Sequence, residues 1–529
     1  MSKSFNWILL PVLVAFTGMA AAMGQMEPDT GMTTDLASAC PAEYQRFAAS
    51  AVDGVRVQEY YRRQGDQLQW QDVARRNLLR SLLEDLQYDG LEPQEYLHGL
   101  QQAGTAPVVP YCTDAGISHD YLLALHHLQH GRLVQAGVEP YWVEAAAALR
   151  QPLPVVDLAL QTAGDLARSF AQARPAQLLY AQLREQLRDG TWLQQDDWIV
   201  VAAGKSLKPG IRDARVVDLR LRLQQGGVLP VDQPDADSAD PYLYDERLET
   251  AVKAFQADHY LEDDGIVGPA TLTELNVSPR QRLMQVRVNL ERLRWLEKYL
   301  EPNLLIVDIA GARLLYVENG QVAWRTRTQV GTVGRQTPLL KSRITHLTMN
   351  PTWTVPPTIF RKDKLPAIRK DIGYLERSRM QVLNGQGQVL DPYSVDWSAP
   401  GNIMLRQAAG PGNALGRVAI RFANPFSVYL HDTPSQHLFG RATRTVSSGC
   451  VRVEGVFSLL DLLAADDSTR QRIEQLLDSG ETRQVNLARL TPVLLAYWTV
   501  EVDVDGRLRF RADSYGLDQR VAEALERGG

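Results

Sequence analysis

The sequence predicts a multidomain α+β protein with a helical first part, a small helical module and a mostly β last part. Apolar residues recur at helical spacing up to about Asp189, and again in segments between residues 206 and 280. From Asn303 the pattern changes to short apolar and alternating runs, which are typical of strands. A chain of 529 residues is long enough for roughly three domains.

The amino terminus has the pattern of a secretory signal peptide, which we place at residues 1–24. Lys3 precedes an apolar run from Trp7 to Phe16, and small residues follow it. The alternative is an uncleaved anchor, but the run is short for a bilayer span and Pro11 interrupts it. We therefore expect export, and no later segment is long and apolar enough to span a membrane.

The composition limits the partners. The chain has 56 basic and 62 acidic residues, a formal net charge of −6, and both signs are mixed along it. Without a basic stripe or tail, we expect no nucleic-acid partner. There are three cysteines, so a single disulfide in an oxidising compartment would leave one thiol over.

A helical domain is predicted at residues 25–205. Two sets of apolar residues lie at helical spacing: Leu79, Leu82, Leu83 and Leu86, then Tyr121, Leu125 and Leu128. Three histidines share the second segment: His126, His127 and His130. A one-turn spacing can bring two imidazoles onto one metal ion, but no cysteine or acidic ligand accompanies them. We therefore favour a structural role and expect no metal site.

A small three-helix module is predicted at residues 206–280. Glu249 to Ala257 is helical with Val252 and Phe255 facing inward, and Gly268-Pro269 opens a last short helix. The pattern "AVKAFQ…DGIVGPAT…LN" resembles the peptidoglycan-binding domain of cell-wall enzymes. A charged, amphipathic linking helix is expected next, at residues 281–300.

The last domain, residues 301–529, is predicted to be mostly β. Asn319-Gly320 is a strong hairpin turn signal, and further strands are expected at Val418–Phe422 and at residues 427–431. Between about 350 and 400 the sequence is proline-punctuated, then helical and charged. We interpret this stretch as an insertion that caps the domain, because insertions beside a site often act as lids.

One cysteine of this domain has the surroundings of a nucleophile. Cys450 lies in "TVSSGCVRV", and His431 ends an apolar strand upstream of it. Cysteine catalysis needs a thiolate, a base and amide donors for an oxyanion, which His431 and the backbone around Gly449 and Cys450 can supply. A cysteine on a strand is more often a small buried hydrophobe. His437, in a polar loop, is the other candidate base.

The motif resembles the signature of the L,D-transpeptidase catalytic domain. That signature is a histidine, about fifteen residues, then Ser/Thr-x-Gly-Cys and an aliphatic residue. Ser447, Gly449, Cys450 and Val451 match it, and His431 lies at the required distance. The chain is similar to the large periplasmic branch of this family, which has a helical scaffold domain, a peptidoglycan-binding domain and a capped catalytic domain.

Two positions depart from the smaller members of the family. Ser448 stands where many have histidine, so that position cannot be the base. Asp432 follows His431 where smaller members have glycine. Adjacent strand residues point to opposite faces, so we expect a backbone carbonyl rather than the Asp432 carboxylate to orient His431.

The resemblance implies a cysteine-dependent L,D-transpeptidase of the periplasm that works without metal or cofactor. Cys450 would attack the amide between diaminopimelate and the terminal D-alanine of a tetrapeptide stem, and the thioester would pass to the diaminopimelate of another stem. The partners implied are peptidoglycan and other cell-wall synthesis enzymes, and carbapenems would acylate the thiol. The substrate-site candidates are Ser447, Ser448, Gly449, Arg452 and Tyr429. On its Val-Arg-Val strand, Arg452 is equally a candidate for a structural cation. Tyr429, Asn424 and Trp353 could line the groove, but packing is favoured for each.

Two other functions remain open at this point. A cysteine LD-carboxypeptidase or hydrolase would use the same site with water as the acceptor, and the degree of water exclusion would decide between them. A non-catalytic wall-binding protein would use the binding module alone. Finally, if Cys450 stays free, Cys40 and Cys112 are available to form a disulfide in the exported protein.

Overall fold

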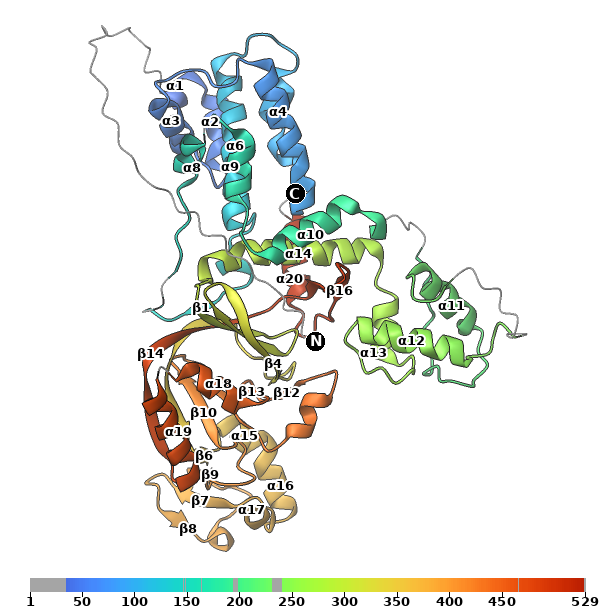
Figure 1. Ribbon diagram of the computed structural model, residues 1–529, viewed down its shortest axis with the longest axis vertical. Coiled ribbons are helices and arrows are strands. Elements are labelled where there is room, and N and C mark those ends of the chain that lie inside the picture. Colours follow the sequence, from blue (N-terminus) through green and yellow to red (C-terminus); the bar gives the residue numbers. More distant parts are fainter. Residues whose placement is uncertain are drawn as a thin grey trace.

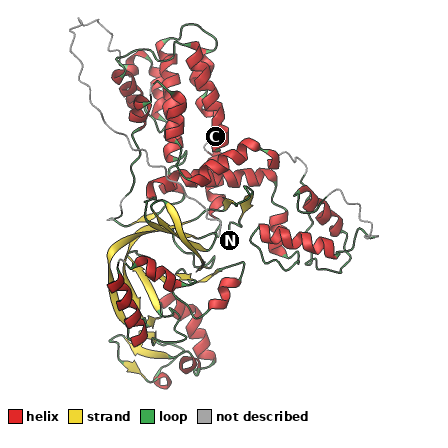
Figure 2. Cartoon of the chain, in the orientation of Figure 1, coloured by secondary structure: helices red, strands yellow, loops and turns green. Residues whose placement is uncertain are grey.

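The computed structural model describes residues 35–145, 147, 149–162, 164–193, 198–230, 240–464 and 466–527. The predicted signal peptide at 1–24 lies outside this range. Helices gather at one end of the molecule and strands in the other half, so the predicted multidomain α+β class is confirmed (Figures 1 and 2). In the described part of the chain, no helix is long and apolar enough to cross a bilayer.

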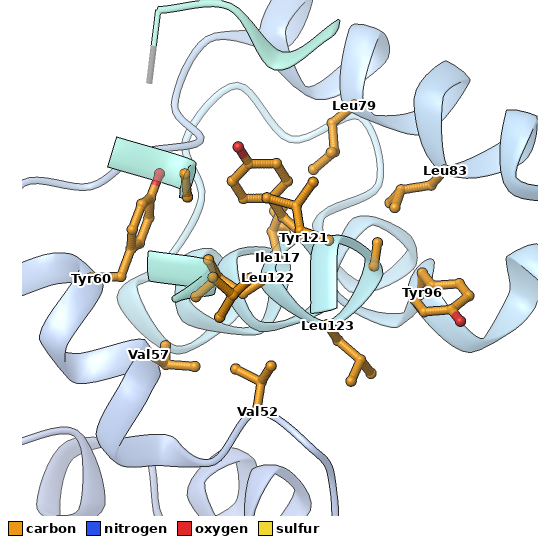
Figure 3. Close-up of a cluster of buried hydrophobic side chains, with 14 of the residues drawn as sticks. Val52, Val57, Tyr60, Leu79, Leu83, Tyr96, Ile117, Tyr121, Leu122 and Leu123 are labelled. Atoms are coloured by element: carbon orange, nitrogen blue, oxygen red, sulfur yellow. The ribbon is translucent and has the colours of Figure 1, made fainter. Parts of the chain in front are cut away.

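In the described residues up to 193, the first part of the chain forms ten α-helices. They are α1 Leu36–Ala39, α2 Pro41–Ala48, α3 Gly54–Arg63, α4 Val73–Glu84, α5 His98–Ala103, α6 Tyr111–His130, α7 Gln135–Val138, α8 Val155–Gln161, α9 Leu166–Ala173 and α10 Leu178–Asp189. The long helix α6 is the centre of their core. Ile117, Tyr121 and Leu122 of α6 are buried among apolar side chains of the surrounding helices (Figure 3).

Three of the four histidines of α6, His126, His127 and His130, are the ones that the sequence analysis considered as metal ligands, and they have structural surroundings. The His127 Nδ1 lies 2.8 Å from the Tyr96 hydroxyl, and the rings of His126 and His130 lie 4.5 Å apart. Burial, followed by repulsion from His130, lowers the pKa of His126 to about 4, so this pair is uncharged at neutral pH. No group of three or more potential metal ligands is present among the residues that the structure describes.

The disulfide between Cys40 and Cys112 is present, which confirms the predicted pairing, and Cys450 is free. It joins the start of α2 to the first turn of α6 across 72 positions of sequence.

We expect one labelled cysteine, Cys450, when the non-reduced protein is denatured in an alkylating reagent and counted by mass spectrometry. Closing a loop of this length stabilises the fold by roughly 4 kcal/mol on the chain-entropy model. Reduction should therefore lower the melting temperature, and Cys40→Ala should lower it to the same extent. Three labels on the non-reduced protein would contradict the bridge.

The small module contains α11 Arg215–Gln225, α12 Glu246–Asp258 and α13 Pro269–Leu275. Val252 and Phe255 are buried in its core as predicted, and Gly268 caps α13 ahead of a proline. The module lies beside the β-rich half (Figure 1). The Glu262 carboxylate accepts the backbone N–H of Ala442 at 3.1 Å, and Tyr260 contacts Glu501.

The linking helix is α14, Pro279–Leu296, and it differs from the prediction in being buried on almost every side. Its charged residues face partners from distant parts of the chain. Arg292 pairs with Glu139 at 2.8 Å and also contacts Asp518 of the carboxy-terminal helix α20, Leu517–Arg527. Because burial of a charge requires a partner, α14 holds the helical and β parts together through ion pairs.

The β-rich part is built on a ten-stranded sheet in the order β1-β5-β10-β11-β13-β4-β3-β2-β14, with β12 paired to β4. The strands are β1 Trp142–Val143, β2 Leu304–Asp308, β3 Arg313–Glu318, β4 Gln321–Gly331, β5 Leu340–Met349, β10 Val418–Phe422, β11 Leu430–His431, β12 Thr445–Ser447, β13 Val451–Val453 and β14 Arg483–Ala496. The β14 strand also pairs with β5, so the sheet curves round and closes.

Three features of this sheet bear on the predictions. Asn319 and Gly320 join β3 to β4 with positive φ angles of 51° and 75°, as the predicted hairpin turn requires. The β1 strand comes from the helical part, which the sequence analysis did not foresee. The strand predicted at 427–431 is confined to Leu430–His431, because Ser427 has a φ of 57° that extended backbone does not allow.

Two helices cover one face of the sheet, α18 Val456–Leu463 and α19 Asp467–Ser479. A short hairpin, β15 Val500–Val502 and β16 Leu508–Phe510, follows β14.

The segment between β5 and β10 folds on a core of its own. It contains α15 Pro357–Ile359, a π-helix Phe360–Lys364, α16 Leu365–Lys370 and α17 Tyr374–Arg377. It also has a four-stranded sheet of β6 Trp353–Thr354, β7 Met380–Asn384, β8 Val389–Leu390 and β9 Ile403–Gln407. Its helices agree with the prediction that this stretch is helical. The strands β7 to β9 were not predicted from the sequence.

Candidate active site

The sheet register brings the candidate residues onto one face. In the parallel pair β11–β13, Leu430 is opposite Val451 and His431 is opposite Arg452. Because side chains alternate along a strand, Cys450 and Arg452 point to the same side as Tyr429 and His431. The residues between them point to the other side, into the apolar core beneath α18 and α19.

His431 is buried, and its neighbour's backbone orients it. The Nδ1 lies 2.5 Å from the carbonyl oxygen of Asp432, so Nδ1–H donates and Nε2 keeps a free lone pair. Burial, followed by repulsion from Arg452, lowers the pKa of His431 to about 3. The imidazole is therefore neutral at neutral pH and able to accept a proton.

The Asp432 carboxylate takes no part in this arrangement. Its Oδ2 accepts the backbone N–H of Arg417 at 2.9 Å, and its Oδ1 accepts from Gln436 at 3.3 Å. A carbonyl thus orients His431, which agrees with the sequence analysis. His437, the alternative base, is exposed on a 3-10 helix, Gln436–Gly440.

Cys450 is half-buried, and its Sγ lies 3.7 Å from the carbonyl oxygen of Ser427. Burial raises the pKa of the Cys450 thiol. Hydrogen bonding to Tyr429 and the charges of Arg421 and Arg452 oppose that shift. The resting site therefore contains a neutral thiol and a neutral imidazole, and thiolate forms only as the proton moves to the base.

The loop before Cys450 is held by its own hydrogen bonds. The Ser447 hydroxyl donates to the carbonyl of Cys450 at 2.6 Å and accepts the backbone N–H of Gly449 at 3.1 Å. Gly449 has a φ of 111°, which side-chain-bearing residues rarely adopt. The Gly449 N–H is engaged by Ser447, so it is not free to donate to a substrate. The Cys450 N–H has no acceptor among the described residues.

The exposed Ser448 connects this loop to the inserted segment. Arg335 Nη1 donates to the Ser448 hydroxyl at 2.9 Å, and both terminal nitrogens of Arg335 bind the Asp363 carboxylate at 2.6 and 2.7 Å. Asp363 belongs to the π-helix of the insertion. One guanidinium therefore joins the insertion to the residue two positions before Cys450.

Two of the other candidates lie beside Cys450. Arg452 donates from Nη1 to the Gln329 amide oxygen at 3.0 Å, and burial lowers its pKa. The Tyr429 ring lies 5.7 Å from the His431 ring, and burial raises the pKa of its hydroxyl to about 12, so the hydroxyl stays protonated.

Asn424 and Trp353, for which packing was also favoured, have structural contacts. Asn424 braces the turn between β10 and β11, with its amide bound to the carbonyls of Phe422 and Val428. Trp353 belongs to the separate sheet of the insertion, opposite Gln407.

Sequence reasoning did not identify Arg335, Gln329 or Arg421. Arg421 had a detectable signal, because it is the one charged residue in the apolar strand Val418–Phe422. Arg335 and Gln329 come from β4 and the loop after it, more than 110 positions before Cys450. Only the fold brings them to the site.

Comparison with known protein families decides which domains these are. Residues 302–474 match the L,D-transpeptidase catalytic domain, residues 55–187 a scaffold domain, and residues 212–275 a peptidoglycan binding domain. The chain carries an L,D-transpeptidase catalytic domain. Cys450 and His431 both lie inside the matched range, so the predicted resemblance is confirmed.

Individual relatives agree with this L,D-transpeptidase assignment. A Haemophilus influenzae protein that bears the name of an L,D-transpeptidase is 33% identical over 241 residues, which is 45% of this chain and 48% of the relative. The match thus spans about half the length of that relative.

Two solved structures show distant similarity. An L,D-transpeptidase from Mycobacterium smegmatis is 13% identical over 37% of this chain and 58% of its own, with a TM-score of 0.17. That of Stackebrandtia nassauensis is 13% identical over 56% and 96%, with a TM-score of 0.19. TM-scores this low add nothing to the assignment.

Proposed function

We propose that this protein cross-links peptidoglycan stems in the periplasm, after export, through a thioester on Cys450. The observation that carries the proposal is the pairing of β11 with β13. It puts the free thiol on the same face of the sheet as a neutral, backbone-oriented His431. The scaffold and peptidoglycan binding domains support a cell-wall substrate.

In the first half of the reaction, His431 Nε2 takes the thiol proton as Cys450 Sγ attacks the carbonyl carbon of the third stem residue, diaminopimelate. The Cys450 N–H stabilises the oxyanion. The carbon–nitrogen bond then breaks, His431 returns the proton to the departing amine, and D-alanine leaves. Cys450 now holds the shortened stem as a thioester.

In the second half, the side-chain amine of a diaminopimelate on another stem attacks the thioester. His431 accepts a proton from that amine and returns it to the sulfur as the carbon–sulfur bond breaks. The product joins two third residues through a new amide, and the enzyme is restored. Neither half needs a group beyond these side chains and the backbone.

The experiment that tests the proposal uses purified protein and tetrapeptide muropeptides, with products weighed by mass spectrometry. A dimer joined through two third residues, together with free D-alanine, is the expected result. Tripeptide monomers alone would identify an LD-carboxypeptidase. Unchanged substrate, together with retained binding of the muropeptides, would indicate a non-catalytic wall-binding protein. Both outcomes would overturn the cross-linking proposal.

We expect Asp363→Asn to shift the products from dimer toward tripeptide by a few-fold. The Arg335–Asp363 pair holds the insertion against the loop of Cys450, and a looser insertion admits water to the thioester. Arg335→Asp should shift the products in the same direction. The double variant Arg335→Asp with Asp363→Arg should restore part of the fraction of dimer among the products. An unchanged product ratio in both single variants would exclude this role.

The pH dependence follows from the two pKa shifts. Because the His431 pKa is lowered to about 3 and the Cys450 pKa is raised, neither group changes its charge near neutrality. We expect kcat/KM to be flat between about pH 5 and about pH 8. An acid limb between about pH 6 and 7 that persists with a donor whose binding is pH-independent would show that His431 titrates with its ordinary pKa.

A further inference from the structure

Arg421 is a cation on the face of the sheet that bears the nucleophile. It lies on β10, which pairs with β11 so that Ala419 is opposite His431 and Ile420 is opposite Leu430. The next position of this antiparallel pair sets Arg421 against Tyr429, on the same side as Cys450. The Arg421 guanidinium carbon lies 3.7 Å from the centroid of the Tyr429 ring.

Neither arginine on this face has an acidic partner among the residues that the structure describes. Arg421 rests on the Tyr429 ring, and Arg452 binds the neutral amide of Gln329. The group opposite Arg421 on β5 is His346, whose pKa is lowered by burial and by Arg421. A neutral imidazole supplies no counter-charge. The site therefore has two positive charges around a neutral thiol and imidazole.

Other buried arginines of the described chain bind an acceptor. Arg292, Arg294 and Arg511 each bind a carboxylate at 2.6 to 2.8 Å. Arg76 and Arg222 donate to backbone carbonyls instead. Partly burying a guanidinium without a counter-charge or a carbonyl acceptor is costly, so the presence of Arg421 on the face that carries Cys450 indicates that a ligand supplies the counter-charge.

We propose that Arg421 binds a carboxylate of the donor stem peptide and so determines which peptides Cys450 accepts. The inference rests on the proposed function and adds which chemical group of the donor peptide the site recognises. A tetrapeptide stem has two carboxylates close to the scissile bond, on the side chain of diaminopimelate and on the leaving D-alanine. Arg421 lies two strands from Cys450, about 10 Å between backbones, which a bound peptide can span.

Carboxylate binding would also assist the base. Both arginines lower the pKa of His431. A carboxylate paired with Arg421 offsets part of that repulsion, and the imidazole becomes a better proton acceptor when a correct donor is bound. A donor without the carboxylate would then lose affinity and turnover together.

The test measures peptide binding in the Cys450→Ala background, so that it does not depend on turnover. Three tetrapeptides are compared by calorimetry: one with both carboxylates free, one with the diaminopimelate carboxylate converted to an amide, and one ending in D-alanine amide. Each is bound to Cys450→Ala alone and combined with Arg421→Met or Arg421→Lys. Arg483→Met, on an exposed arginine of β14, is the matched control.

We expect Arg421→Met to weaken binding of the free peptide by roughly ten- to one-hundred-fold. For the peptide whose recognised carboxylate has been converted to an amide, the substitution should cause no further loss of affinity. The identity of that peptide shows which carboxylate Arg421 binds. Arg421→Lys should retain part of the affinity, and Arg483→Met all of it. Equal losses for all three peptides, or no loss for any, would overturn the proposal. Tight wild-type binding without D-alanine release by the intact enzyme would refute the cross-linking function but leave this inference standing.

Discussion

Cys450→Ala will abolish both D-alanine release and dimer formation from tetrapeptide muropeptides. Cys450 is the free thiol of the chain, because Cys40 and Cys112 are joined to each other. Without the sulfur there is no thioester, and the oxyanion donor and base alone cannot form the covalent intermediate. The measurement is product mass spectrometry over a time course long enough to detect a loss of several orders of magnitude.

The fold should survive this change. The Cys450 side chain is half-buried at the edge of the site and is absent from the apolar core beneath α18 and α19. An unchanged melting temperature and retained peptide binding are the controls. Activity within a few-fold of wild type would show that another residue is the nucleophile.

His431→Ala is expected to lower the rate by roughly 10²–10⁴-fold. In the proposed mechanism its Nε2 is the proton acceptor of the thiol, and a base is needed because burial raises the pKa of Cys450, so that little thiolate exists without one. The rate should be measured under single-turnover conditions as the appearance of acyl-enzyme, because acyl-enzyme formation is the step that requires proton transfer from Cys450 to His431.

His437→Ala is the matched control for the base. His437 is exposed on a short helix beyond β11, and in the described structure no hydrogen bond ties its side chain to the site. Its replacement should leave acyl-enzyme formation within a few-fold of wild type. A loss as severe as that of His431→Ala would reverse the assignment of the base.

Local sequence patterns predicted much of this fold. Helical spacing identified the scaffold helices, and Asn319-Gly320 identified the β3–β4 turn because few other residues accept positive φ at both positions. The pairing of Cys40 with Cys112 followed from the expected export, from the cysteine count and from the assignment of Cys450 as a free nucleophile.

Long-range pairing lay beyond these patterns. The pattern of α14 predicted a charged, amphipathic helix, whereas Arg292 is buried against Glu139 and Asp518 from distant segments. Periodicity shows how polar residues are distributed along a segment. It cannot show that a charged residue of this segment will be buried against an opposite charge from a distant segment. The β1 strand was missed for the same reason: its two residues take their partner from β5.

The candidate site divides in the same way. Cys450, His431 and a backbone carbonyl as the group that orients His431 could be predicted, because they belong to one local motif of strand, loop and strand. Arg421, Arg335 and Gln329 reach that motif through β10 and β4, and their contacts depend on sheet register. Ser447 and Gly449 were placed in the site by the motif, but only the hydrogen bonds between them show that they shape the loop.

The central claim is that Cys450 forms a thioester with the donor stem, and the mass of the trapped acyl-enzyme tests it most directly. The enzyme is mixed with excess tetrapeptide donor in the absence of an acceptor amine, quenched in acid within one turnover, and weighed intact and after digestion. We predict one adduct with the mass of the donor minus D-alanine, on the peptide that contains Cys450, and its removal by hydroxylamine at neutral pH. An adduct on Ser447 or Ser448, or D-alanine release without any adduct, would contradict the account.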